Sequence, residues 1–110
     1  MNEAIRVALH RLGIYENTQG YYAARAAVSV ALQEPESLLM VTKWLYPEAA
    51  KQCGGSWQSL EKNLRAAVSD IWRNHPEGLQ ALSDAPLRRK PTASQFVALL
   101  ASALCAENTD

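Results

Sequence analysis

Residues 47–67, PEAAKQCGGSWQSLEKNLRAA, decide the fold, because two segments with helical periodicity meet there at a pair of glycines. The first segment has the small residues Ala49 and Ala50 in its middle, where a second helix can approach closely. Gly54 follows, and glycine adopts a positive φ without the steric penalty that a Cβ would cause. These features predict a helix that ends in a tight turn.

The second segment begins near Ser56, which is a good N-cap residue, and it turns Leu60 and Leu64 inward. Two helices that cross at close range through a glycine-containing turn are typical of a helix-turn-helix, here between about residues 47 and 73. The opposite side of the second helix is polar and carries Gln58, Ser59, Glu61, Lys62 and Arg65. We expect this side to form a protruding ridge.

The polar ridge has two interpretations. Its side chains carry donors and acceptors suited to base edges and phosphates, which favours a helix that binds the major groove of DNA. An ordinary helical hairpin with a solvated face would show the same pattern of residues. The residues by themselves leave both open.

The rest of the chain also has helical periodicity, without the alternation expected of strands. Thr92 and Gln95 have the form of a capping box at the start of the last helix. We predict Ser37 as an N-cap and Pro47 as the start or bend of a helix. The sequence therefore predicts a compact all-α domain over residues 1–110, with helices at about 2–12, 18–33, 37–45, 56–73, 79–83 and from 92 onward.

Length and composition favour one globular domain: 110 residues, 48% hydrophobic and 20% charged. No apolar run approaches the roughly 20 residues that cross a bilayer, and the charged N-terminal segment is unlike a signal peptide. Cys53 and Cys105 lie in no zinc-type spacing, so we expect packed, reduced thiols in a cytoplasmic protein without membrane association.

The net charge of zero conceals a segregated distribution. Residues 43–73 contain five basic side chains (Lys43, Lys51, Lys62, Arg65 and Arg73) against three acidic ones (Glu48, Glu61 and Asp70). The loop before the last helix adds Arg88, Arg89 and Lys90 without an acid. A basic side of the molecule, suited to phosphate contacts, is the expected result.

Nothing in the sequence predicts catalysis or a cofactor. His10 and His75 lack partners at metal-ligand or nucleophile spacings, so we expect no enzyme activity and no bound metal. Trp44 and Trp72 are interpreted as core anchors, whereas Trp57 either packs on the turn or contacts the DNA backbone.

Four stretches carry a family resemblance: GYYAARAAV (20–28), TKWLYPEAAKQ (42–52), SLEKNLRAAVSDIW (59–72) and KPTASQF (90–96). They resemble the effector domain of stage zero sporulation protein A, a response regulator of endospore-forming bacteria, over residues 5–104. The resemblance implies a six-helix fold whose recognition helix reads a TGTCGAA-type box in the major groove of double-stranded DNA. It also implies tandem binding of copies on DNA and contact with a sigma factor of RNA polymerase.

Position by position, Glu61, Lys62 and Arg65 correspond to the family's base-reading Glu and basic residues. Lys62 and Ser59 stand at positions where the family typically has Arg. Lys62 replaces the bidentate guanidinium with a point charge, and Ser59 replaces it with a neutral hydroxyl. Lys90 corresponds to a Lys for which the resemblance implies a phosphate contact.

In the two-component systems of this family a phosphoacceptor receiver domain precedes the effector domain. No such domain is predicted here, so the chain is expected to be an excised or a stand-alone effector domain. The alternative function is a protein-interaction module on the same scaffold, with weak or no DNA reading.

Overall fold

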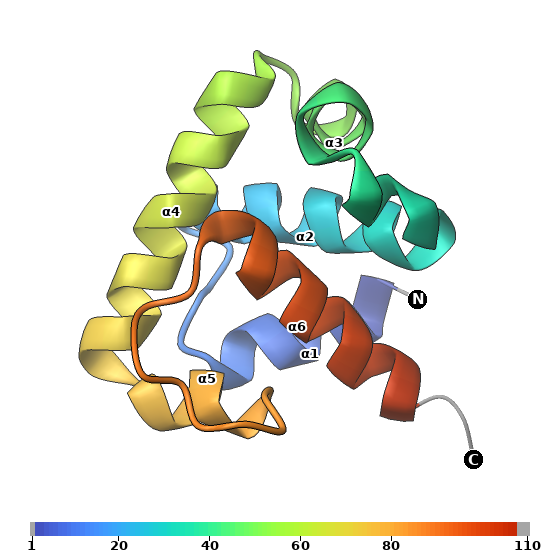
Figure 1. Cartoon of the computed structure of the whole chain (residues 1–110). Coiled ribbons are helices and arrows are strands. Elements are labelled where there is room, and N and C mark those ends of the chain that lie inside the picture. The colour runs from blue at the N-terminus through green and yellow to red at the C-terminus, as the bar shows by residue number, and fades with distance from the viewer. Residues whose placement is uncertain (1, 108–110) are drawn as a thin grey trace.

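A computed structural model describes residues 2–107, so residues 1 and 108–110 of the predicted domain lie outside it. No strand occurs between residues 2 and 107, which confirms the predicted all-α class. The helices are α1 (Asn2–Arg11), α2 (Gln19–Gln33), α3 (Tyr46–Cys53), α4 (Trp57–Asn74), α5 (Pro76–Ala81) and α6 (Ala93–Glu107) (Figure 1).

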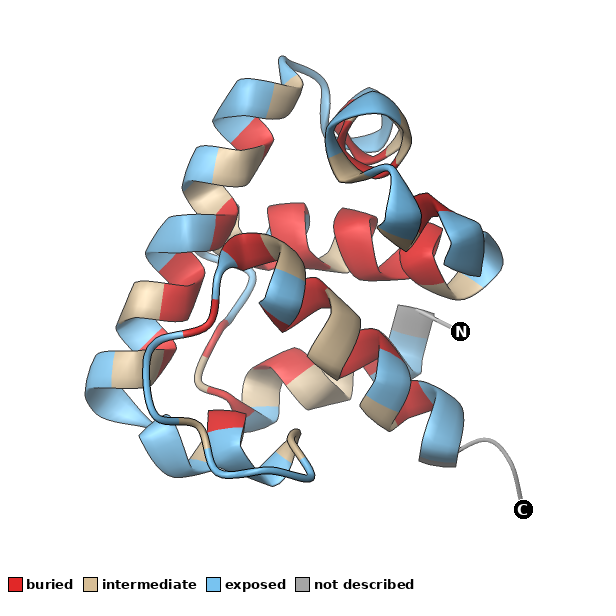
Figure 2. Ribbon diagram, viewed as in Figure 1, coloured by how far each residue is buried: buried red, intermediate tan, exposed pale blue. Residues whose placement is uncertain are grey.

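Helix α2 lies at the centre of the fold and is buried on most of its circumference (Figure 2). Its side chains are mostly small, so α1, α3, α4 and α6 can all pack against it. Thr18 caps the helix by accepting a hydrogen bond from the Tyr21 amide at 3.3 Å. The position of α4 therefore depends on a rigid, buried support.

The expected helix boundaries are confirmed wherever a specific cap marks them. Gly13 follows α1 with a φ of 86°, which favours glycine. At the start of α6 the Gln95 amide donates to Thr92 Oγ1 at 3.2 Å, and Thr92 N donates to Gln95 Oε1 at 2.9 Å. This is the predicted capping box.

Ser37 is not the N-cap that the sequence predicted. A 3₁₀ turn, Pro35–Leu39, begins two residues earlier, because proline supplies a φ suited to the first position of a helical turn. Ser37 is 0% exposed, and its hydroxyl has no hydrogen-bond partner among the described residues. The prediction of one continuous helix over 37–45 was also wrong, because the 3₁₀ turn ends at Leu39 and a separate π-helical turn follows over Val41–Leu45.

A π-helical turn, Val41–Leu45, leads directly into α3 and accommodates Pro47. In an α-helical continuation the Pro47 ring would crowd the carbonyl of residue 43. The wider turn avoids this, and the Leu45 amide reaches the Met40 carbonyl at 3.3 Å. Pro47 thus occupies the first turn of α3, as predicted.

Two further predictions need correction. Helix α5 spans Pro76–Ala81 instead of 79–83, because a proline again begins the helix. Trp72 packs against the core, whereas Trp44 is only half-buried and lies outside the group of residues packed there.

The two cysteines are exposed rather than packed, which corrects a further prediction. Within the described residues, no helix combines the length and the apolar character that spanning a membrane requires.

Candidate nucleic-acid interface

The turn between α3 and α4 depends on two successive glycines. Gly54 has a φ of 74°, and its amide donates to the Ala50 carbonyl at 2.8 Å. Gly55 has a φ of 135°, a conformation that L side chains rarely adopt. A Cβ at either position would meet nothing within 4 Å, so the requirement for glycine is conformational and not one of space.

Helices α3 and α4 contact each other, and the residues that the sequence singled out are buried on both. Ala49 and Ala50 are buried on α3, and Leu60 and Leu64 are buried on α4. The hydroxyl of Ser56 accepts a hydrogen bond from the Ser59 amide at 3.1 Å and so caps α4. The expected helix pair is therefore present, with its apolar contact at the crossing.

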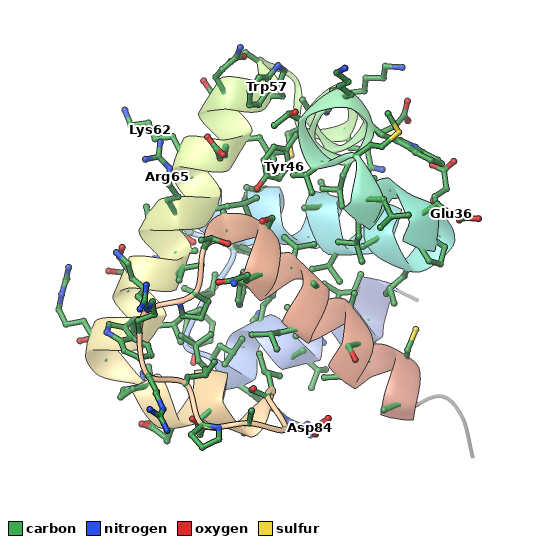
Figure 3. The ribbon with its side chains drawn as sticks, in the orientation of Figure 1. Glu36, Tyr46, Trp57, Lys62, Arg65 and Asp84 are labelled. Carbon is green, nitrogen blue, oxygen red and sulfur yellow. The ribbon has the colours of Figure 1, made fainter. Side chains whose placement is uncertain are left out.

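Trp57, whose role was open, packs on the protein side of the turn. Its ring stacks on Tyr46, with centroids 6.1 Å apart and an interplanar angle of 21°. Tyr46 is itself buried at the start of α3. The stacked pair connects the beginning of α4 to the beginning of α3 (Figure 3).

The outward side of α4 presents charged side chains to solvent. Lys62 and Arg65 are exposed and project away from the rest of the molecule (Figure 3). Gln58 and Ser59 are exposed as well, and Glu61 is half-buried. The cause is the apolar stripe of α4, which faces α2 and α6 and leaves the opposite side free.

The charges of Lys62 and Arg65 are not neutralised within the described part of the chain. The ion pairs found there are Glu3–Arg6, Glu48–Lys51 at 3.0 Å and Asp70–Arg73 at 3.7 Å, and His10 hydrogen-bonds Glu16 at 2.7 Å. None involves Lys62 or Arg65. The acidic residues Glu36 and Asp84 lie far from this face (Figure 3). The outward side of α4 thus combines two exposed cations with one half-buried acid, Glu61.

One flank of α4 borders a concavity of about 530 Å³, which we call the Lys90 flank. Its lining includes Glu61 and Arg65 from α4, Tyr46 from α3 and Lys90 from the loop before α6. Lys90 Nζ donates to Ser69 Oγ of α4 at 3.0 Å. Lys90 thus lies on the same flank as Glu61 and Arg65, two of the base-reading candidates.

Tyr46 forms part of the wall of the Lys90 flank. Burial raises the pKa of its phenol to about 12; the negative charge of Glu61 adds to this effect and Arg65 opposes it. The hydroxyl is therefore protonated and neutral at physiological pH, next to the two charged residues of α4.

The opposite flank of α4 borders a smaller concavity of about 260 Å³, which we call the Arg25 flank. Ser59 and Asn63 of α4 line it together with Tyr22 and Arg25 of α2. Ser59 and Glu61, which the sequence placed on one ridge, therefore border different concavities. The predicted ridge is broad enough to reach both flanks.

The three consecutive basic residues before α6, Arg88, Arg89 and Lys90, do not all lie at the same site. Arg88 and Arg89 line a third concavity of about 590 Å³ beside α6, together with Leu87 and Leu99. They do not line the concavity that contains Lys90. Of the three loop cations, only Lys90 shares a concavity with α4.

Arg25 is the residue of this region that sequence reasoning missed. It lies 34 residues before Ser59 and is the only charged residue of α2, and packing brings the two together. The sequence signal that could have identified Arg25 is that it is the only charged residue in GYYAARAAV.

The histidines show no metal-binding arrangement. His10 Nε2 lies 2.7 Å from Glu16 Oε1, and the hydrogen bond from His10 lowers the pKa of the Glu16 carboxyl. No group of three or more His, Cys, Asp or Glu side chains that could hold a metal occurs in the part of the chain that the structure describes.

Two helices joined by a glycine turn, with an outward basic face on the second, define an all-helical DNA-binding domain of the helix-turn-helix class. Residues 5–104 match the family described as the C terminal of the sporulation initiation factor Spo0A. The chain belongs to this family, so it is a DNA-binding transcription-regulator domain and not an enzyme.

Proposed function

We propose that this domain regulates sporulation genes by inserting α4 into the major groove of a TGTCGAA-like box. The observation that carries the proposal is the outward face of α4, where Lys62 and Arg65 are exposed and have no ion-pair partner among residues 2–107. A protruding helix with uncompensated cations suits a groove lined by phosphates and base acceptors.

The residue types of the face suggest individual roles. Arg65 suits bidentate bonding to a guanine, and Lys62 acts as a point charge on a guanine or a phosphate. Glu61 suits the exocyclic amine of a cytosine. Gln58 and Ser59 supply adaptable hydrogen bonds at the N-terminal end of α4.

Phosphate contacts are proposed for the loop before α6. Lys90 is the best placed of the three cations, since it already lies beside α4. Arg88 and Arg89 border a separate concavity, so we propose that they contact the backbone farther from the box. These contacts position the domain without reading sequence.

One titration tests the proposal. Labelled duplexes that contain either the box or a scrambled box are titrated at 50 and 200 mM salt. We expect preferential binding of the box, with an affinity that falls steeply as salt rises because bound phosphates release counterions. Equal affinity for both duplexes would refute sequence-specific reading.

The same titration addresses the alternative of a protein-interaction module. That function predicts no duplex binding even at 50 mM salt. Family membership favours the DNA-binding function, and the exposed cations of α4 agree with it.

We also propose tandem binding of copies and contact with an RNA polymerase sigma factor. A duplex with two adjacent boxes should bind two copies with positive cooperativity, measured by stoichiometric titration. A ternary complex of box DNA, domain and sigma factor, observed as a further mobility shift, would support the second contact.

A further inference from the structure

Arg25 carries a positive charge that is held in place but not neutralised. Its guanidinium carbon lies 5.4 Å from the centroid of the Tyr22 ring and 5.8 Å from that of Tyr21, which are cation–π distances. Arg25 forms no ion pair with another described residue. The two rings limit its mobility while leaving its charge available to an anion.

This charge is directed toward the helix-turn-helix. Arg25 lines the same concavity as Ser59 and Asn63 of α4 and the glycines of the turn, and it is the only charged residue of that lining. Cys53 Sγ donates to the Tyr22 carbonyl at 3.4 Å and connects the end of α3 to α2 here. Burial raises the pKa of the Cys53 thiol, and the nearby Arg25 charge acts against that rise.

A helix in the major groove has a phosphate backbone on each side, because the groove is only about 12 Å wide. The structure shows a concavity on each flank of α4, one with Lys90 and one with Arg25. Each cation comes from an element other than α4. The arrangement matches two strands with one anionic backbone each.

We propose that the Arg25 flank is a second backbone-binding site, in which Arg25 contacts a DNA phosphate of the strand opposite to the one that Lys90 contacts. This inference rests on the proposed function, since it requires α4 to lie in the major groove. The ligand is the backbone phosphodiester, so the contact is independent of base sequence.

The central experiment measures duplex affinity as a function of salt for Arg25→Gln and for Arg11→Gln. Arg11 is an exposed arginine on α1 without an ion pair in the described structure, so it controls for the change in net charge. Loss of one phosphate contact should reduce the slope of log K against log salt by about 1. The affinity lost between 50 and 200 mM salt should then be about fourfold smaller for Arg25→Gln, and unchanged for Arg11→Gln.

A rescue variant makes the test specific to the flank. Asn63 of α4 borders the same concavity and is not one of the proposed reading residues, so adding Asn63→Lys to Arg25→Gln should restore affinity and salt slope. The same addition should not rescue Lys90→Gln, whose cation lies on the other flank. Rescue of both variants would show a general charge effect and would overturn the proposal.

A measurement on the unaltered protein covers the case in which Arg25→Gln fails to fold. Single methylphosphonate substitutions neutralise individual phosphates of the duplex. We expect reduced affinity at positions on both strands beside the groove; sensitivity on one strand only would overturn the second site. A different result would refute the proposed function itself, namely that the unaltered protein binds the box and the scrambled duplex equally.

Discussion

The two flanks of α4 differ in how their cations are supplied. On the Lys90 flank the cation comes from a loop that carries three consecutive basic residues. On the Arg25 flank it comes from a central, mostly buried helix. The loop lysine holds its place through one hydrogen bond to Ser69, whereas Arg25 is held by two aromatic rings.

This difference shows how one helix can acquire a positive environment on two sides in a chain of zero net charge. A loop cation is visible as a run of letters in the sequence. A cation in a core helix becomes part of a surface only when the packing of α2 against α3 and α4 turns its side chain toward the concavity.

The largest expected effect weakens the packing of α4, the helix that lies between the two flanks. Leu64 is 0% exposed on α4, and Leu64→Ala should reduce the free energy of unfolding by about 2–5 kcal/mol through lost burial and a cavity. Chemical denaturation measures this. Leu39→Ala is the matched control, because Leu39 is 85% exposed, and a loss of more than about 0.5 kcal/mol there would contradict the interpretation.

The next effect distinguishes base reading by α4 from the phosphate contacts proposed on its two flanks. Arg65→Ala should cost about 1–3 kcal/mol of binding to the box and relax selectivity at one base pair. Arg73→Ala on the same helix is the control, because Arg73 is already paired with Asp70 at 3.7 Å. Competition with single-base variants of the box measures both; unchanged selectivity in Arg65→Ala would exclude a base contact.

A smaller effect separates Lys90 from the other loop cations. Lys90→Gln should weaken box and scrambled duplexes equally and reduce the salt slope by about 1, since a phosphate contact carries no sequence information. Arg88→Gln and Arg89→Gln should also reduce the slope, by at most about 1 each, since their proposed backbone contacts lie at another concavity farther from the box. Equal effects of all three substitutions would show that the loop acts as one unit.

The smallest effect concerns pH and the wall of the Lys90 flank. The pKa of Tyr46 is raised from 10 to about 12, so its stabilisation is complete below pH 10 and is lost as pH rises toward 12. The ionisation of Tyr46 should therefore leave stability unchanged near neutral pH. Absorbance titration of the phenols, compared with Tyr46→Phe, measures this; a Tyr46 that ionises near pH 10 would contradict its burial.

Much of the fold could be predicted, because helix signals are local. The Thr18 and Ser56 caps, the capping box at Thr92 and the positive φ of Gly54 all act within a few residues. The segment 35–47 was predicted less well. Two prolines there favour 3₁₀ and π turns over one regular helix, and Ser37 is buried instead of capping.

The sequence by itself determined the all-helical class, the glycine turn and the polar composition of α4, since periodicity and backbone preference depend on neighbouring residues. Tertiary structure alone decided that Trp57 stacks on Tyr46, that Lys90 separates from Arg88 and Arg89, and that Arg25 reaches the flank of Ser59. These contacts join residues distant in the chain, so they follow from the way whole helices pack on α2 and not from any local pattern.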